Sequence, residues 1–269
     1  MKETAMTRFD HADDAATWLD EAHRAGRRYE PLPDRFRPAD LAGAYDIQRA
    51  FVARLEKRGR AVHGWKIALT AETMQQMVGI DRAVGGRIAA PAILESPAEI
   101  RAADHGRVCI ECEVALRLGR DLAPGGAPFA EGEIIAAVDA CAAAFEIADD
   151  RNADYATLDA MSLIADNAWN GGMVLGQIHP PADPAELAAA TAVLEEDGVE
   201  AGRGEGRDAM GHPYAGLRFL ADEMTARGET LRAGDWVLTG TVIRTRFPAV
   251  GQTLIYRHSL LGEVRARIV

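Results

Sequence analysis

Apolar positions recur every three or four residues in the first part of the chain. This spacing predicts a helix over 13–27, which stops at Gly26, and a second helix whose apolar positions run over 41–55. Pro38 stands where the first position of this helix is expected, a place that suits proline, and the helix is expected to end near Gly59. We therefore expect residues 1–60 to form a helical N-terminal subdomain that caps the remainder of the chain.

From residue 61 onward the pattern changes to short apolar runs separated by turn residues. Helices are predicted over 71–78, with Thr70 as the N-cap, and over 133–143 and 213–227. Strands are predicted over 61–69, 108–118, 143–149 and 173–176, followed by a hairpin over 191–202 with Asp197-Gly198 in its turn and by further strands over 231–269. Strands whose connections are mostly not helical favour an α+β domain over 61–269, not a doubly wound parallel sheet.

Two glutamates flank one residue in the apolar segment 108–118. On a strand, Glu111 and Glu113 point to the same face, with about 7 Å between their Cα atoms. Two carboxylates so close in an apolar element repel each other, and burial penalises both charges. A divalent cation with oxygen ligands would neutralise them. The alternative is an edge strand whose glutamates face water.

Two more charged residues interrupt apolar segments. Glu146 lies within 143–149, where it needs a partner, and Arg151 is one alternative to a metal. Lys66 lies within 61–69, and the alternative to a functional role is a surface lysine whose stem covers apolar side chains. Together with Glu111 and Glu113, these residues suit a cation that holds an acidic substrate.

Charge and composition narrow the class of protein. The 269 residues carry a net charge of −11, which argues against nucleic acid or an anionic membrane as the main partner. No apolar run approaches the roughly 18 to 20 residues of a membrane span, and the N-terminus lacks the apolar core of a signal peptide. We therefore expect a cytoplasmic enzyme.

The three cysteines do not form a disulfide framework. Cys109 and Cys112 make a C-x-x-C motif, but on a strand they point to opposite faces, and no second such motif completes a zinc site. We expect them, and Cys141, to be ordinary buried thiols.

Seven segments carry a family resemblance in their order along the chain. They are AYDIQRAF (44–51), GWKIALTAETMQQMVGID (64–81), IECEVALRLGRDL (110–122), FEIADDR (145–151), ADNAWNGGMVLG (165–176), GHPYAGLRFLADEM (211–224) and LRAGDWVLTG (231–240). Over about residues 40–255 the chain resembles the 2-keto-4-pentenoate hydratase and 4-oxalocrotonate decarboxylase group of the fumarylacetoacetate hydrolase superfamily.

The resemblance implies a mixed β-roll core of the fumarylacetoacetase C-terminal type, and Mg²⁺ or Mn²⁺ held by Glu111, Glu113 and Glu146. It also implies 2-oxo or 2-hydroxydienoate acids as substrates, whose carboxylate and 2-oxygen would chelate the metal. Lys66 corresponds to the active-site lysine of this group, and Asp81 to an acidic residue after its G-[IV]-D turn. We expect Asp81 to act as the proton shuttle.

Further candidates surround these residues. Asp166 and Asn167 lie in a loop where either capping or catalysis would suit them, and with Thr241 and Arg244 they are our candidates for substrate binding. The segment GTVIRTRFP (240–248) departs from the GSxTxPx pattern of the group, and Arg244 or Arg246 could read a second carboxylate or simply lie on the surface. Trp169 stands where the group has small residues; it would either narrow the pocket or pack into the core.

The leading interpretation is a metal-dependent hydratase that converts a 2-hydroxy-2,4-dienoate into a 4-hydroxy-2-oxo acid during the degradation of aromatic compounds. The second is a 2-oxo-3-enedioate (4-oxalocrotonate) decarboxylase. An acylpyruvate C–C hydrolase would need a glutamate–histidine pair, for which only His11, His23 and His63 offer themselves. A non-catalytic partner of a related lyase would have lost site residues, and none is lost here. A homo-oligomer, and association with a related lyase, are expected from the resemblance alone.

Overall fold

Two mixed β-sheets form the centre of the computed structural model, which describes residues 9–269. The larger sheet has the strand order β2-β1-β10-β5-β6-β7-β3. Its members are β1 (Val62–Ala68), β2 (Val84–Ala89), β3 (Ile93–Glu95), β5 (Val108–Leu118), β6 (Val138–Asp149), β7 (Asn170–Leu175) and β10 (Trp236–Arg246). Only the β1–β10 and β3–β7 pairs are parallel. The long central strands β5 and β6 pair antiparallel along almost their whole length.

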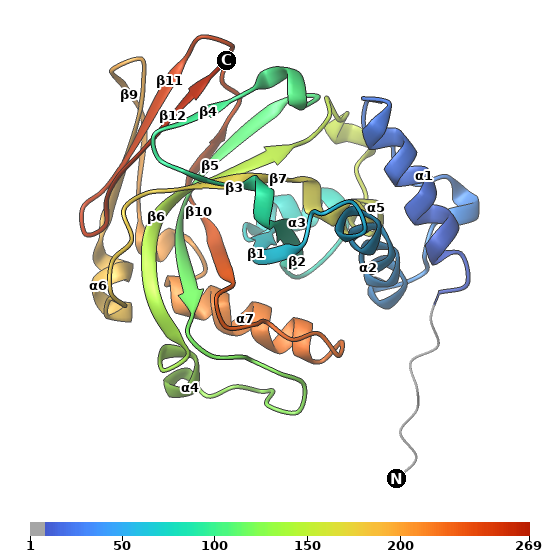
Figure 1. Cartoon of the computed structure of the whole chain (residues 1–269), viewed down its shortest axis with the longest axis horizontal. Coiled ribbons are helices and arrows are strands. Elements are labelled where there is room, and N and C mark those ends of the chain that lie inside the picture. Colours follow the sequence, from blue (N-terminus) through green and yellow to red (C-terminus); the bar gives the residue numbers. More distant parts are fainter. Residues whose placement is uncertain (1–8) are drawn as a thin grey trace.

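The smaller sheet lies at the upper left of Figure 1 and has the order β4-β12-β11-β8-β9. Its members are β4 (Ala98–Ile100), β8 (Thr191–Glu196), β9 (Val199–Glu205), β11 (Thr253–His258) and β12 (Gly262–Ile268). Asp197 and Gly198, both at positive φ, form the predicted two-residue turn between β8 and β9. The two sheets leave no closed barrel, and the predicted α+β fold with a mixed β-roll core is confirmed.

Helices cover the sheets on two sides (Figure 1). They are α1 (Ala12–Arg24), α2 (Leu41–Glu56), α3 (Glu72–Val78), α4 (Glu131–Ile135), α5 (Ala160–Ala165), α6 (Pro184–Ala189) and α7 (Pro213–Thr225). The side chain of Asp40 caps α2 by accepting from the amide of Gly43, at 2.9 Å. The helix therefore begins at Leu41, and the expectation that Pro38 is its first residue is wrong. The ring of His212 caps α7, whose first residue is Pro213, as the sequence predicts.

The two predicted N-terminal helices are present and pack on each other. Their apolar cluster, with Leu19, Ile47 and Phe51 at its centre, also includes Ala165 of α5. The N-terminal helices are thus in contact with the site-bearing part of the chain. The proposed division at residue 60 stays a prediction, and residues 1–8 of that subdomain lie outside the described residues.

Two local predictions are wrong. The helix expected over 133–143 is confined to α4 (Glu131–Ile135), and strand β6 already begins at Val138. Alanines dominate this segment, and burial between two neighbouring strands overrides their helix propensity. The N-cap of α3 is Ala71 and makes no side-chain cap, so Thr70 does not have the role expected for it.

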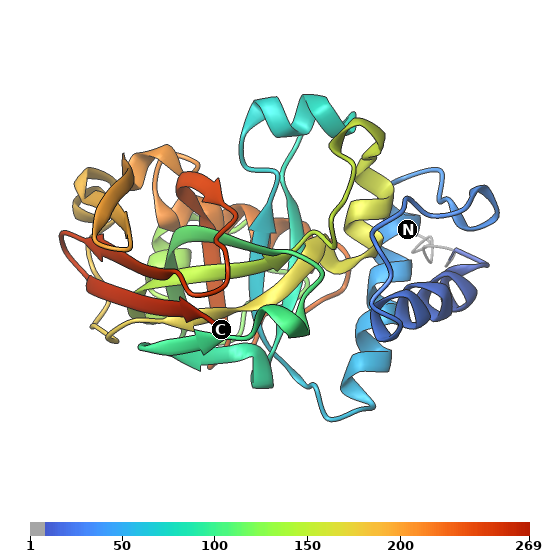
Figure 2. The same cartoon turned by 90° about the horizontal axis from the view of Figure 1, so that it is seen from above.

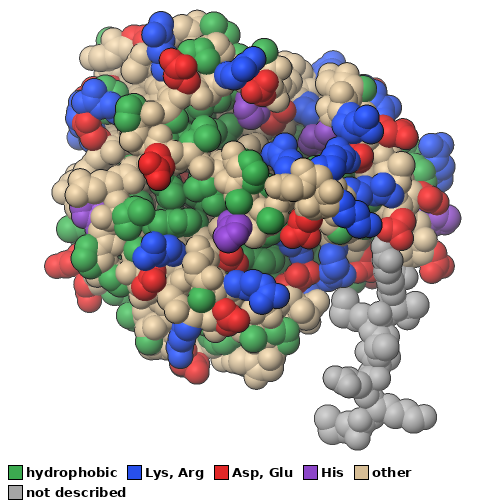
Figure 3. All heavy atoms as spheres, viewed as in Figure 1, with side chains coloured by type: hydrophobic (Ala, Val, Ile, Leu, Met, Phe, Trp, Pro, Cys, Tyr) green, Lys and Arg blue, Asp and Glu red, His purple; other side chains and the backbone are tan. Residues whose placement is uncertain are grey.

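The surface and the helices bear on possible partners. Among the described residues, none of the helices is long and apolar enough to cross a membrane. On the face shown in Figure 3, acidic and basic side chains are interspersed, and the basic ones are most frequent in the right half of the view. The three cysteines are free and buried, as expected.

Candidate metal centre and active site

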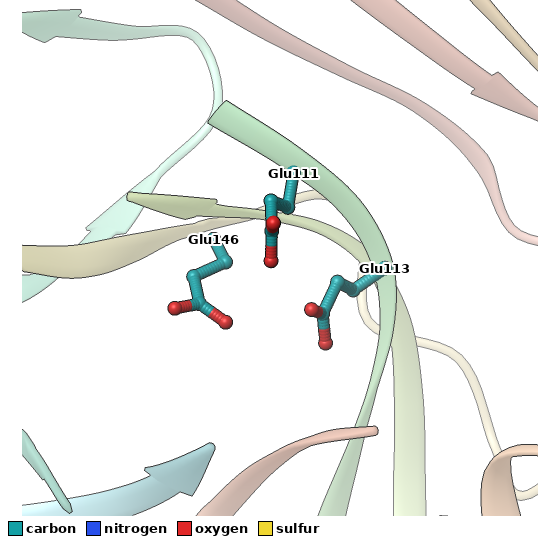
Figure 4. Close-up of side chains that lie close together, drawn as sticks. All are labelled: Glu111, Glu113 and Glu146. Atoms are coloured by element: carbon teal, nitrogen blue, oxygen red, sulfur yellow. The ribbon is translucent and has the colours of Figure 1, made fainter. Parts of the chain in front are cut away.

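Three glutamate side chains from neighbouring strands converge on one point (Figure 4). Glu111 and Glu113 project from the same face of β5, and the β5–β6 register places Glu146 directly opposite Glu111. One carboxylate oxygen from each of the three residues lies within 4.8 Å of the other two. Glu113 and Glu146 are fully buried, and Glu111 is half-buried. The alternative of an exposed edge strand is therefore wrong.

Each carboxylate is held by one group from another strand. The backbone N–H of Gly240 donates to Oε2 of Glu113 at 2.7 Å, and the hydroxyl of Thr245 donates to Oε1 of Glu111. Both donors belong to β10, whose register against β5 is irregular between Leu238 and Arg246. Because Gly240 has φ +109°, a side chain would be strained at that position.

Lys66 forms an ion pair with Glu146. Its ammonium also donates to the carbonyl oxygen of Ala168 at 3.0 Å. Lys66 is only 3% exposed, so the surface-lysine alternative is wrong, and so is the alternative that Arg151 pairs with Glu146. The cluster as described thus contains three acidic side chains and one basic side chain, that of Lys66.

The charges in this cluster do not balance. Burial and the charges of Glu146 and Glu111 hold the pKa of Glu113 well above its usual range. Burial likewise raises the pKa of Glu146, to about 7, although Lys66 opposes the shift. Burial alone would lower the pKa of Lys66, but the charges of Glu146 and Glu111 raise it.

Unsatisfied oxygen atoms show that the cluster fits a cation. Within residues 9–269, Oε1 of Glu113 and Oε2 of Glu146 are buried and accept no hydrogen bond. A buried carboxylate oxygen without a donor is costly, and a hard divalent cation with oxygen ligands removes that cost. These three residues suit Mg²⁺ or Mn²⁺ in both donor type and spacing.

A cavity of about 690 Å³ opens beside the cluster. Glu111 and Lys66 line it, together with Thr241, Arg244 and Thr245 of β10. The hydroxyl of Thr241 donates to the carbonyl of Ile243 at 2.6 Å. Arg244 is exposed, and its guanidinium has no hydrogen bond or ion pair with the described residues. The structure therefore brings two of the four candidate substrate-binding residues to the metal cluster.

Asp166 and Asn167 do not line this cavity. Asp166 is buried and forms ion pairs with Arg151 and with His23, the latter at 2.5 Å. Burial alone would raise the pKa of Asp166, but its two basic partners lower it. Asn167 makes two 2.8 Å hydrogen bonds to the backbone of Arg87. Both residues support the loop that carries Ala168, and their contact with substrate stays a prediction.

Asp81 also lies away from the cavity wall. Its side chain is 88% exposed and lies 3.4 Å from the guanidinium of Arg82. It follows α3, which contributes Met74 and Met77 to the cavity, but Asp81 itself is not a lining residue. Its role as proton shuttle stays a prediction.

Trp169 satisfies both alternatives considered for it, since it lines the cavity and packs edge-on against the rings of Tyr29 and Tyr155. Of the two arginines considered for a second carboxylate, Arg244 lines the cavity, whereas Arg246 does not and is ion-paired with Glu196, with 2.7 Å between Nε and Oε1. None of the three candidate histidines lines the cavity. The glutamate–histidine pair of a C–C hydrolase therefore has no counterpart in the cavity wall described here.

Sequence analysis missed the two groups of β10 that hold the glutamates. No periodicity would have revealed Thr245, because the irregular register of β10 breaks the alternation that relates strand neighbours. It also missed Ala168, which acts through its carbonyl and sits at φ +49° between two further positive-φ residues, Asn167 and Trp169. A backbone contact of this kind leaves no signal in side-chain chemistry.

Comparison with known proteins agrees with this geometry. Residues 75–269 match the family model described as fumarylacetoacetate (FAA) hydrolase C-terminal. The chain belongs to this family. A 2-keto-4-pentenoate hydratase from Burkholderia vietnamiensis is 34% identical over 93% of this chain and 95% of its own length. A 4-oxalocrotonate decarboxylase from Pseudomonas putida is 26% identical over 100% of this chain and 98% of its own length.

Solved structures agree with the sequence relatives. The structure of 4-oxalocrotonate decarboxylase from Pseudomonas putida G7, complexed with magnesium and adipate, superimposes with a TM-score of 0.89 at 25% identity, covering 98% of this chain and 100% of that one. The two sequence relatives described above, a hydratase and a decarboxylase, are both lyases.

Proposed function

We propose that this protein is a Mg²⁺- or Mn²⁺-dependent hydratase that converts a 2-hydroxy-2,4-dienoate into a 4-hydroxy-2-oxo acid. The observation that carries the proposal is the convergence of Glu111, Glu113 and Glu146, with unsatisfied oxygens, beside a cavity. Relatives that are 34% identical are named 2-keto-4-pentenoate hydratases, which supports hydration as the reaction.

The reaction combines a tautomerisation with the addition of one water molecule. The enol at C2 loses its hydroxyl proton and becomes a ketone, while C5 gains a proton. Water then adds across C3 and C4, with its hydroxyl bonding to C4 and its proton to C3. A bound divalent cation supplies stabilisation of negative charge on the 2-oxygen.

The side chains of this protein would supply the remaining steps. Lys66, held between Glu146 and the carbonyl of Ala168, places a fixed positive charge beside the site where an enolate develops. Arg244, free of other partners among the described residues, would bind the substrate carboxylate, with Thr241 beside it. Asp81, in the turn after α3, is our candidate for carrying the proton that C5 gains.

The second candidate is decarboxylation of a 2-oxo-3-enedioate. A 4-oxalocrotonate decarboxylase aligns over the whole of this chain, and the same cation and lysine would stabilise the enolate left by loss of CO₂. The relative's identity is lower, at 26%, than the 34% of the hydratases, so we place this second.

A substrate panel separates the two. The purified protein with Mg²⁺ or Mn²⁺ is given a 2-hydroxy-2,4-dienoate and a 2-oxo-3-enedioate, and both the dienol absorbance and CO₂ release are followed. Loss of absorbance without CO₂ supports the hydratase. Release of CO₂ from the diacid at the higher kcat/KM would replace that proposal by the decarboxylase.

Three further expectations accompany the proposal. A cytoplasmic location, a homo-oligomer and association with a related lyase stay predictions. Light scattering of the purified protein, alone and mixed with a candidate lyase, tests the last two.

A further inference from the structure

The wall of the cavity that does not carry the charged groups is apolar. Met74 and Met77 of α3, Leu163 of α5, Trp169 and Phe247 contribute to it. These residues come from three separate segments, and Figure 2 shows that α3 (cyan) and the α5 segment (yellow-green) rise on the same side of the sheets. Three segments have thus been brought together to form one apolar surface.

Part of this surface is exposed to solvent. Met77 is 48% exposed and Phe247 is 50% exposed, and both are among the few large apolar side chains in residues 9–269 that are open to this degree. Apolar side chains exposed at the wall of a cavity are typical of a ligand-binding surface. A ligand with an apolar end would remove both from water.

The basic residues that line the cavity determine how many substrate carboxylates it can pair. Of the described lining residues only Lys66 and Arg244 are basic, and Lys66 is bound to Glu146. Arg244 is the chain neighbour of Thr245, whose hydroxyl contacts Glu111. Among the described lining residues, Arg244 is the one cation without a partner, and its place next to Thr245 suits the carboxylate at C1. The guanidinium of Arg107 lies 4.8 Å from the ring of Phe247 but is ion-paired with Asp150, so the apolar wall offers no unpaired cation for a second carboxylate.

The volume also exceeds what a five-carbon acid needs. Cavities of roughly 300 to 1,000 Å³ hold drug-sized ligands, and this one measures about 690 Å³. A short acid anchored at the glutamates would leave the surface of Met77 and Phe247 in contact with water.

We propose that the substrate carries at C5 an apolar substituent longer than a methyl group, and that this substituent packs on Met74, Met77, Leu163, Trp169 and Phe247. This inference rests on the proposed hydratase function, because it assumes the 2-hydroxy-2,4-dienoate head group of that substrate. The proposal excludes substrates that carry a second carboxylate at C5.

The test uses the full chain with saturating Mg²⁺ and a series of 2-hydroxy-2,4-dienoates that differ only at C5: hydrogen, methyl, propyl, phenyl and carboxylate. We expect kcat/KM to rise by about fourfold for each methylene that becomes buried. We expect the carboxylate to fall at least about tenfold below the propyl compound, since it would be buried without a cation. An unchanged kcat/KM beyond methyl, or a preference for the diacid, overturns the proposal.

Substitutions locate the effect. Phe247→Ala and Met77→Ala should each lower the ratio of kcat/KM for the propyl acid to that for the unsubstituted acid by about fivefold to tenfold. Val250→Ala is the matched control, because Val250 is also an exposed apolar residue (68%) of the segment after β10 but does not line the cavity. An unchanged ratio in both cavity variants would contradict the assignment.

A binding measurement separates this inference from the hydratase proposal. Saturated 2-oxo acids with the same C5 groups are titrated by calorimetry in the presence of Mg²⁺, which requires no turnover. If no dienoate is hydrated, the proposed function is wrong, but affinity that rises with the length of the apolar group still supports the apolar subsite. Affinity that is independent of that length overturns it.

Discussion

Two clusters of buried charge lie in this molecule and differ in how completely they are neutralised. In the first, three glutamates share one lysine, and the pKa values of Glu113 and Glu146 are raised. In the second, Asp166 is matched by Arg151 and His23, and its pKa is lowered. A buried acid with enough basic partners holds the fold together, whereas acids in excess mark a place where a cation binds.

The comparison predicts opposite outcomes when an acid is neutralised. Asp166→Asn leaves Arg151 buried without its counter-charge, so we expect the free energy of unfolding to fall by about 3–5 kcal/mol. The affinity for Mg²⁺ should change by less than about twofold, since Asp166 does not line the cavity. Urea denaturation and calorimetry measure the two quantities.

Asp34→Asn serves as the control for this variant, because Asp34 is 96% exposed in its pair with Arg37 and should cost less than about 0.5 kcal/mol. If Asp166→Asn instead raised KM while stability stayed unchanged, Asp166 would bind substrate, as the sequence suggested, and the contrast between the clusters would fail.

Neutralising an acid of the first cluster should weaken metal binding and activity without lowering stability. Glu113→Gln removes a metal ligand, so the affinity for Mg²⁺ and kcat/KM should each fall at least about 100-fold, more than loss of a supporting group causes. The metal-free variant should be no less stable than the wild type, because one of three repelling charges is gone. Calorimetry and thermal unfolding in EDTA test both statements.

Glu200→Gln is the matched control, because Glu200 is paired with Arg203 on the exposed strand β9 and should leave metal affinity and activity intact. Full metal affinity in Glu113→Gln would remove the metal centre from the proposal.

Of the two charge clusters, the sequence allowed only the glutamate cluster to be predicted. The three glutamates and Lys66 could be predicted because each is a charged residue inside an apolar strand, and the two-residue period of β5 places Glu111 and Glu113 on one face. The matched cluster could not be predicted, because none of its members interrupts an apolar strand: His23 lies in α1, Arg151 follows β6 and Asp166 follows α5. The strand β6 was mistaken in part for a helix because its alanines favour a helix in isolation, and only burial between two neighbouring strands overrides that preference.

The pH dependence of stability should also differ in sign between the clusters. The folded-state pKa of Glu146, about 7, exceeds that of an ordinary glutamate, so the metal-free protein binds more protons when folded. Its stability should therefore fall by on the order of 2 kcal/mol between pH 5 and pH 7. Asp166, with a lowered pKa, adds stability that is present above its unfolded pKa and is lost as the pH falls through its folded pKa.

Thermal unfolding across this pH range, with and without saturating Mg²⁺, measures the difference. Bound cation should remove the decline above pH 5, because it replaces the proton as the neutralising charge. A decline of equal slope in the presence of Mg²⁺ would assign it to groups outside the three glutamates.

The smallest expected effect concerns the support of Glu111. The hydroxyl of Thr245 donates to this carboxylate and fixes its orientation, so Thr245→Val, which keeps the shape and removes the donor, should weaken Mg²⁺ binding by about tenfold. Thr245→Ser retains the hydroxyl and should restore affinity to within about threefold of the wild type. Calorimetry with Mg²⁺ gives the affinities, and the electron paramagnetic resonance signal of bound Mn²⁺ reports any change in ligand geometry. Equal affinity in the valine and serine variants would mean that Glu111 is oriented by β5 alone, and that the irregular register of β10 serves only Gly240 and Glu113.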